Sequence, residues 1–491
     1  MTHTLGIDIG TFDSKGVLVD SAGRIVASAN RPHKMIVPCA GWAEHRAEQD
    51  WWGDFVFLCR ALLAQSGLDP ARIKAIATSA IGPCMLPVDA DGAPLMNGVL
   101  YGVDTRATDQ IVALNARIGA EVIHARCGNA LTSQSVGPKI LWLKEIQPDL
   151  YARTAMVLSS TSYLTWKLTG EYVIDHYTAA SFSPLYDVAT QDWTAELAPD
   201  ILPLEKLPRL MWSTEIAGHV TVQAAMETGL AIGTPVTCGT IDAAAEAVSV
   251  GVQHPGEMMM MYGSTIFIIQ VTADPVRDPR LWYAPWLFPG THASMAGLAT
   301  SGTLTTWFRD TLAPDTDFPA LVAEATASPK GAKGLLCLPY FSGERTPIHD
   351  PYARGAFFGL NLTHTRADMF RAVVEGIAAG TAHVLETYAE VGASPDRVLA
   401  VGGGTKNALW LQATSDFSGV TQQVCAKTVG ASYGNAFLAA LAIGAAQPGN
   451  IVDWNPNAST VSPEPVAAYA VQYPLWKRLY VQTRDIMQAL P

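Results

Sequence analysis

Several features that would assign a protein to other functional classes are missing from this sequence. No apolar run approaches the ~18 residues of a membrane span, and a strand pattern begins within the first few residues, which leaves no room for a signal peptide. The 32 Lys and Arg residues are outnumbered by 44 Asp and Glu residues, and the resulting net charge of −12 argues against nucleic-acid binding. We therefore expect a cytoplasmic protein with no membrane or nucleic-acid partner.

The cysteines also lack any pattern typical of a metal site or a disulfide framework. There are seven of them, widely scattered along the chain, with no Cys-x-x-Cys pair and no zinc-like spacing. Reduced thiols are the expected state of such cysteines in a cytoplasmic protein.

Length and composition predict two domains. The chain has 491 residues, which exceeds the ~250–300 residues at which a single core stops growing. Hydrophobic residues make up 49% and charged residues 15%, as in compact globular proteins. The predicted domains are residues 1–247 and 248–491.

The opening stretch, residues 5–20, has the pattern of a strand that ends in a polar turn. Apolar residues alternate with glycine and aspartate over residues 5–10, so one face of the strand is apolar and the other is nearly bare. Further apolar runs at 16–19 and 24–29 predict a three-stranded meander.

The first turn of this meander carries groups suited to phosphate. Gly10 lets backbone N–H groups approach an anion closely, and Thr11, Ser14 and Lys15 add hydroxyl and ammonium donors. Asp8, on the bare face of the strand, would hold the water shell of a Mg²⁺ ion that bridges the phosphates. A buried strand with an ordinary polar turn has the same local pattern, so the phosphate interpretation depends on motifs further along.

One such motif is a repeat of the opening stretch. Residues 257–271 again form an apolar strand, a tip with Gly263, Ser264 and Thr265, and a second apolar strand. Two copies about 250 residues apart predict two like domains that face each other across a cleft.

A carboxylate lies between the two copies, at a predicted strand-to-helix turn. A short apolar strand ends at Gly239, and Asp242 opens a helix of small residues. Asp242 is either a plain helix-capping aspartate or a general base that takes a proton from a bound hydroxyl.

Candidates for sugar binding lie in the first half. Trp42 would pack against the apolar face of a sugar, or would instead close a loop onto the core. Asp104 and Arg106, two residues apart at a strand end, would bind substrate or form a salt bridge with each other. Gly82 and Pro83 end a strand abruptly, and their assignment to the substrate comes only from the family resemblance given below.

The second half adds glycine-rich turns before helices. Gly302 begins an amphipathic helix, and a strand runs into three glycines, Gly402 to Gly404, with Asn407 at the start of the next helix. Glycine before a helix allows close contact with a flat ring or a phosphate.

In this order, the motifs resemble those of the FGGY carbohydrate kinases, a branch of the actin, Hsp70 and hexokinase superfamily. The most specific segments are 5–20, 239–242, 261–265 and 401–416, and the family signature begins at Gly355 and ends at Glu375. The resemblance implies an α/β fold of two ribonuclease-H-like domains around a central cleft, with ATP and Mg²⁺ as cofactors. It leaves a homodimer open.

The resemblance also implies residue roles. It makes Asp242 the catalytic base and assigns the metal to Asp8 and Asp242. It assigns ATP binding to Gly10, Thr11, Ser14, Lys15, Gly263, Ser264, Thr265, Gly302, Gly403, Gly404 and Asn407.

Within the family the chain looks most like the xylulokinase group, but it departs from that group around the substrate. Polar residues of the group are replaced at Ile81 to Cys84, at Gly102-Val103 and at Ala243. A buried hydroxyl without a partner costs ~1–3 kcal/mol. The resemblance implies an ATP-dependent kinase of a small ketose, with xylulose or a related pentulose first. A kinase of another polyol or linear metabolite and a non-catalytic sensor are the alternatives.

Overall fold

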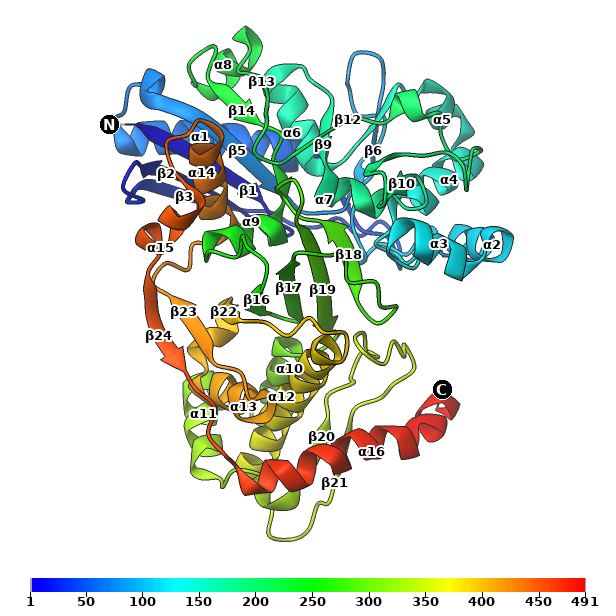
Figure 1. Cartoon of the computed structure of the whole chain (residues 1–491), viewed down its shortest axis with the longest axis vertical. Coiled ribbons are helices and arrows are strands. Elements are labelled where there is room, and N and C mark those ends of the chain that lie inside the picture. The colour runs from blue at the N-terminus through cyan, green and yellow to red at the C-terminus, as the bar shows by residue number, and fades with distance from the viewer. Residues whose placement is uncertain (1, 491) are drawn as a thin grey trace.

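The alternating pattern at the start of the chain forms the strands that it predicts. In the computed structural model, which describes residues 2–490 (Figure 1), β1 (His3–Ile9), β2 (Asp13–Asp20) and β3 (Ile25–Pro32) form an antiparallel meander. β5 (Ile73–Ala80) runs parallel to β1 and extends the sheet on its other side. The three-stranded prediction is therefore confirmed.

Three short strands complete the first sheet. β14 (Pro235–Thr237) and β15 (Thr240–Ile241) both run parallel to β5, and β13 (Ile216–His219) pairs antiparallel with β14. The main order is β13-β14-β5-β1-β2-β3. The carboxyl ends of β1, β5 and β15 lie together, which brings residues following distant strands to one edge.

The second sheet repeats this arrangement, and the predicted internal repeat is confirmed. Its order is β18-β19-β17-β16-β22-β23-β24, with β16 parallel to β22 and antiparallel to β17. Its strands are β16 (Glu257–Tyr262), β17 (Ile266–Thr272), β18 (Trp282–Pro285), β19 (His292–Leu298), β22 (Arg397–Val401), β23 (Gln422–Cys425) and β24 (Asn457–Val461).

The two faces of β1 meet different helices. The apolar face packs against α1 (Gly53–Ser66) in one core cluster, as the alternation requires. The bare face lies against α14 (Ala431–Ala442): a Cβ atom on Gly6 would lie 2.0 Å from the Ser432 carbonyl oxygen. Glycine is needed there because the helix backbone lies directly on the strand.

This packing crosses the predicted division of the chain. α14 belongs to the second half of the sequence but covers the first sheet, as Figure 1 shows. The boundary predicted between 247 and 248 falls inside α9 (Asp242–Ser249). The division at this position stays a prediction, and α14 is a helix that crosses it.

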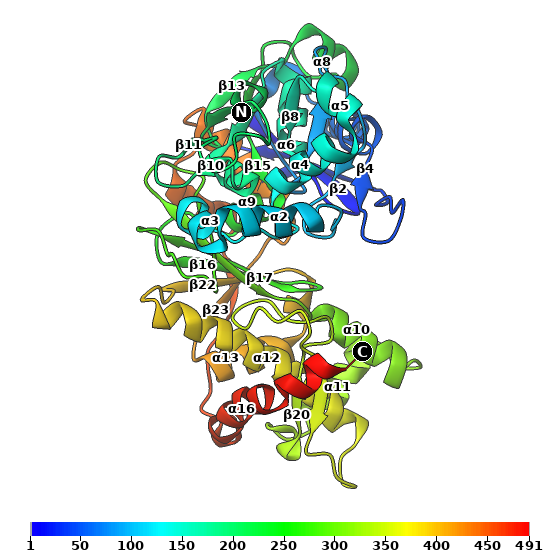
Figure 2. The same cartoon turned by 90° about the vertical axis from the view of Figure 1, so that its right-hand side faces the viewer.

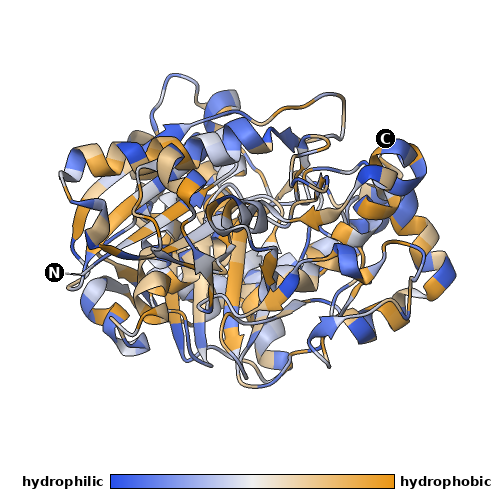
Figure 3. Cartoon of the chain, turned by 90° about the horizontal axis from the view of Figure 1, so that it is seen from above, coloured by the Kyte–Doolittle hydropathy of each residue, from blue (hydrophilic) through white to orange (hydrophobic). Residues whose placement is uncertain are grey.

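The remaining helices surround the two sheets, which are stacked along the long axis of the molecule (Figure 2). Hydrophobic residues lie along the central strands (Figure 3). The longer helices are α2 (Thr108–Ile118), α3 (Ala120–Cys127), α4 (Val136–Ile146), α6 (Ser160–Thr169), α8 (Val222–Thr228), α10 (Gly302–Leu312), α11 (Phe318–Ala327), α12 (Arg366–Glu390), α13 (Ala408–Ser418) and α16 (Ala467–Ala489).

Two expectations about composition can be compared with the fold. All seven cysteines are free, and six of them are buried, as expected for reduced thiols. Within residues 2–490, no helix is both long and apolar enough to cross a membrane.

Candidate active site

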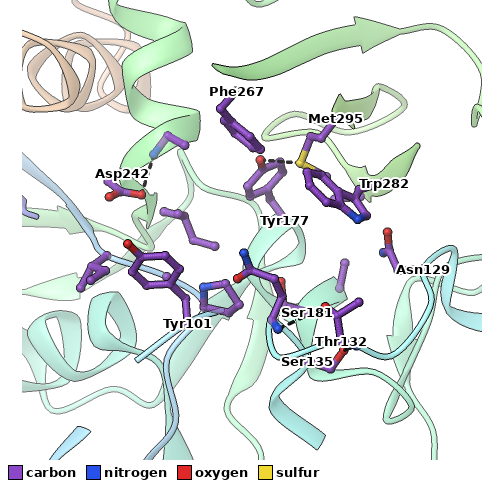
Figure 4. A pocket seen from close by; sticks show the side chains of 18 of the residues that line it. Tyr101, Asn129, Thr132, Ser135, Tyr177, Ser181, Asp242, Phe267, Trp282 and Met295 are labelled. Carbon is purple, nitrogen blue, oxygen red and sulfur yellow. Dashed lines mark hydrogen bonds between the residues drawn. The ribbon is translucent and has the colours of Figure 1, made fainter. Parts of the chain in front are cut away.

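A cavity of about 400 Å³ lies between the two units and is lined by both (Figure 4). Side chains from the first sheet edge, from α9 and from the second sheet all border it. The sequence-predicted residues that line it are Asp8, Thr11, Gly82, Pro83, Asp242 and Thr265. The fold thus gathers residues from four separate segments in one place.

Asp242 lies at the first position of α9, directly after β15. Its Oδ1 accepts a hydrogen bond from the Ala243 backbone N–H at 2.8 Å, and the carboxylate borders the cavity near Tyr101 (Figure 4). Burial, together with the negative charge of Asp8, raises the pKa of Asp242 well above its usual value. A carboxylate with a raised pKa is a better proton acceptor than an ordinary aspartate.

Asp8 is held by a chain of hydrogen bonds that begins on α14. The Asn435 amide donates to the Ser79 hydroxyl at 2.7 Å, and this hydroxyl donates to Asp8 Oδ1 at 2.7 Å. Asn435 also donates to the Ile7 carbonyl at 2.9 Å. Burial raises the pKa of Asp8 to about 6, and the Ser79 hydrogen bond and the Lys15 charge oppose that rise. This chain fixes the orientation of the carboxylate.

Glu246 is a third carboxylate on the cavity wall, and the sequence analysis missed it. It lies four residues after Asp242 on α9, so both side chains are on the same face of the helix. Burial and the charge of Asp8 raise the pKa of Glu246 to about 7. Helical spacing from Asp242 would have found it.

The two predicted phosphate tips border the same cavity, through Thr11 and Thr265. The first tip is tied down because His33 Nε2 donates to the Gly10 carbonyl at 3.1 Å. At the second tip, the Gly302 N–H donates to the Gly263 carbonyl at 3.1 Å. A Cβ atom on Gly302 would lie 2.4 Å from that carbonyl oxygen, so this close approach requires glycine.

Ser14 does not lie at the first tip, so the prediction that it binds phosphate is wrong. It is fully buried in β2, and its hydroxyl donates to Asp54 Oδ2 at 2.8 Å. Alternation along the strand places Ser14 and Lys15 on opposite faces. Lys15 pairs with Asp8 across β1 and β2 and its side chain is 49% exposed, so it stays a candidate.

Asp104, Arg106 and Trp42 do not line the cavity either, and their predicted contact with substrate is wrong. The Arg106 guanidinium is buried, lies 4.0 Å from the Trp42 ring centroid, and pairs with Asp104 and Glu44 at 2.8 Å each. The Ala43 N–H donates to Asp104 at 2.7 Å. These residues form a structural cluster, which is the salt-bridge alternative for Asp104 and Arg106. The departure at position 103 is not in the wall of the cavity.

The residues proposed for adenosine lie beyond the second tip. Gly403 and Gly404 begin a short 3₁₀ helix after β22, and Asn407 caps α13 by accepting a hydrogen bond from the Trp410 N–H at 3.2 Å. None of them borders the cavity within the described residues. Their contact with adenosine stays a prediction.

The opposite wall of the cavity is aromatic, and no sequence motif indicated it. Tyr177, Phe267 and Trp282 gather there with Met295, and the Tyr177 hydroxyl donates to the Met295 sulfur at 2.9 Å (Figure 4). These residues come from a short helix in the first half and from strands of the second sheet. Tyr101 was within reach of the sequence analysis, since it directly precedes the predicted departure at Gly102.

The fold and site define a two-domain kinase of the actin, Hsp70 and hexokinase type. Residues 3–249 match the N-terminal domain of the FGGY family of carbohydrate kinases, and residues 258–443 match its C-terminal domain. The chain belongs to the FGGY family of carbohydrate kinases, and the resemblance found in its motifs is confirmed.

Individual relatives agree with this assignment. The structure of a xylulose kinase from Rhodospirillum rubrum is 31% identical, with a TM-score of 0.93 over 99% of each chain. Xylulose kinase from Bacillus subtilis is 28% identical over 506 residues, covering 100% of this chain and 99% of the relative. A Plasmodium falciparum glycerol kinase structure at 20% identity and a TM-score of 0.89 shares the fold, over 100% of this chain and 99% of that one.

Proposed function

We propose that this carbohydrate kinase transfers the γ-phosphoryl group of ATP to a hydroxyl of a five-carbon ketose, xylulose or a related pentulose. The observation that carries the proposal is the position of Asp242, in a cavity bordered by both phosphate tips. The names of the full-length relatives support the choice of ketose.

In the proposed reaction, Asp242 takes the proton of the acceptor hydroxyl. The acceptor oxygen forms a bond to the γ-phosphorus, the bond from that phosphorus to the bridging oxygen breaks, and ADP leaves. The tips at Thr11 and Thr265 orient the phosphates from opposite sides. The alternative of a non-catalytic sensor does not explain why this carboxylate faces the cavity.

The donor set suits a divalent cation. Mg²⁺ is usually bound by one or two carboxylates together with phosphate oxygens and water. Asp8 and Asp242 both border the cavity and their charges interact, so they would hold the ion between them and the phosphates. The ion would neutralise phosphate charge. Among residues 2–490 there is no set of three side chains that would bind a metal alone, so substrate would have to complete the site.

A second candidate function, a kinase of another small polyol, is favoured by the composition of one wall. Gly82, Pro83 and Ala243 border the cavity without offering a polar side chain. Such a wall cannot form a hydrogen bond with each hydroxyl of a ketose. The kcat/KM values of epimers should therefore differ by only ~10–100-fold.

A coupled assay of ADP release over pentuloses, hexuloses and polyols tests both candidates. We expect xylulose to be phosphorylated and at least one other pentulose or polyol to come within about 100-fold in kcat/KM. If none of these acceptors caused ADP release, the proposal would be contradicted. A sharp preference for one other polyol would favour the second candidate. The cytoplasmic location and a homodimer stay predictions.

A further inference from the structure

The charge of the cavity wall is unbalanced for a site that transfers a phosphoryl group. Three carboxylates border it, Asp8, Asp242 and Glu246, whereas Arg345 is the sole Lys or Arg among the described lining residues. The migrating group carries several negative charges, and in a site that excludes water these need fixed cationic donors. Arg345 is therefore the one cationic side chain that the described lining offers to these charges.

The backbone on both sides of Arg345 is fixed. The buried Glu344 carboxylate accepts hydrogen bonds from the Ala299 N–H at 2.6 Å and from the Arg345 N–H at 2.7 Å. The Glu344 N–H donates to the Asp350 carbonyl at 2.9 Å, and the Thr346 N–H donates to the Gly297 carbonyl at 3.2 Å. The segment is thus tied to the end of β19, which leads into the turn that supports the second tip.

In contrast to its backbone, the guanidinium of Arg345 has no hydrogen bond or ion pair with any residue in the described part of the chain, 2–490. The buried arginines Arg106 and Arg371 are by contrast paired with carboxylates. The Arg345 residue is exposed to solvent and borders the cavity, so its guanidinium is free to bind an anion that enters there.

The guanidinium also acts across the cavity on the first unit. Burial raises the pKa of the Tyr101 phenol, and the positive charge of Arg345 opposes that rise. The Tyr101 hydroxyl lies 3.4 Å from the Thr11 hydroxyl of the first tip, and the charge of Asp242 acts on the same phenol. Arg345, from the second unit, therefore borders the same cavity as Tyr101, Thr11 and Asp242 from the first.

We propose that Arg345 is a catalytic residue whose guanidinium binds the oxygens of the phosphoryl group during its transfer. This inference rests on the proposed function, and adds a residue that the phosphate motifs do not contain. A guanidinium matches phosphoryl oxygens with two parallel N–H donors and keeps its charge at any working pH. Because the charge spreads over these oxygens in the transition state, the interaction should strengthen there more than in the ground state.

The test compares Arg345→Ala and Arg345→Lys with Arg354→Ala, a control in the same loop that does not border the cavity. We expect kcat of Arg345→Ala to fall by about 10²–10³ while the KM for the sugar changes less than about threefold. Added guanidinium chloride at millimolar concentration should restore part of the activity of Arg345→Ala, and Arg354→Ala should behave like the unsubstituted enzyme. A raised KM with unchanged kcat, or equal losses in both Ala variants, would overturn the proposal.

A binding experiment separates this inference from the proposed function. MgADP with aluminium fluoride mimics the phosphoryl group during its transfer. The affinity of the protein for this complex can be measured by calorimetry even where no sugar is turned over. We expect Arg345→Ala to bind it at least about tenfold more weakly than the unsubstituted enzyme, with MgADP alone bound equally. Lack of turnover with every sugar refutes the proposed function, whereas equal affinity for the fluoride complex refutes the role of Arg345. Thermal unfolding of both variants shows whether either loss comes from the fold.

Discussion

Replacing Asp242 by Asn should move activity and stability in opposite directions. The substitution keeps the shape of the side chain and its hydrogen bond with the Ala243 N–H, but it removes the proton acceptor. General-base catalysis contributes about 10²–10⁴-fold, so kcat should fall by that factor, which corresponds to about 2.7–5.5 kcal/mol in the barrier. The KM for the sugar should change little, because the side chain still fills its place in the wall.

The effect on stability follows from the neighbouring charges. Burial and the negative charge of Asp8 raise the pKa of Asp242 above its value in the unfolded chain, so burying this carboxyl costs stability at pH 8, where the unfolded chain carries it ionised. An amide removes that penalty, and single stabilising substitutions contribute about 0.5–2 kcal/mol, so Tm should rise by about 1–4 °C. This gain should shrink as the pH falls toward 4, because the carboxyl, already protonated in the folded state, then becomes protonated in the unfolded state as well.

Asp175→Asn is the matched control for Asp242→Asn. Asp175 is also buried and burial raises its pKa to about 6, but it accepts hydrogen bonds from Thr240 at 2.8 Å and Ser213 at 3.1 Å and does not border the cavity. Because burial raises its pKa as well, its variant should also gain stability at pH 8, but without a selective loss of kcat. Scanning calorimetry at pH 5 and 8, with steady-state kinetics, tests both variants. Retained turnover in Asp242→Asn, or a loss of stability at pH 8, would refute this reasoning.

Three further substitutions test the support of the site. Ser79→Ala removes the hydrogen-bond donor that lowers the pKa of Asp8. The acid limb of the plot of kcat/KM against pH should therefore shift to higher pH by about 0.5–1 unit. An unchanged acid limb would show that Asp8 does not take part in the reaction. Arg106→Ala should lower the free energy of unfolding in urea by about 3–5 kcal/mol, because Asp104 stays buried without its partner. A changed KM for the sugar in the folded protein would instead support the predicted role of Arg106 in substrate binding. Gly302→Ala should lower kcat/KM for ATP by about 10–100-fold, since the new methyl group displaces the second tip, and normal ATP kinetics would show that the tip tolerates the shift.

The elements with a local signature were predictable from the sequence. Both strand–tip–strand segments, the helix that begins at Asp242 and the cap at Asn407 formed as expected, because period-2 alternation and capping residues act over a few positions. The meeting of Thr11 and Thr265 at one cavity also followed, since the repeat implies two like units.

The predictions that failed depend on contacts between distant segments, which the local sequence pattern does not contain. Asp104 and Arg106 have the same spacing whether they face substrate or each other, and only the contacts of Trp42 and Glu44 with Arg106 decide between the two. The aromatic wall joins Tyr177 of the first half to Phe267, Trp282 and Met295 of the second, and no single motif contains them. Arg345 stands in a turn whose backbone partners are set by the end of β19, so its free guanidinium became visible only in the fold.

The packing of α14, from the second half of the sequence, on the first sheet also affects how the chain folds during synthesis. The Asn435 amide that completes the hydrogen-bond chain to Ser79 follows it by 356 positions. At about 5–20 residues per second, a ribosome needs roughly 20–70 s to cover that distance. During that time α14 does not yet cover the bare face of β1. The last strand of the first sheet, β15, is made well before α14. The first half of the chain therefore cannot complete its native packing until the segment at 431–442 has left the ribosome, and that wait is a window in which a chaperone would act.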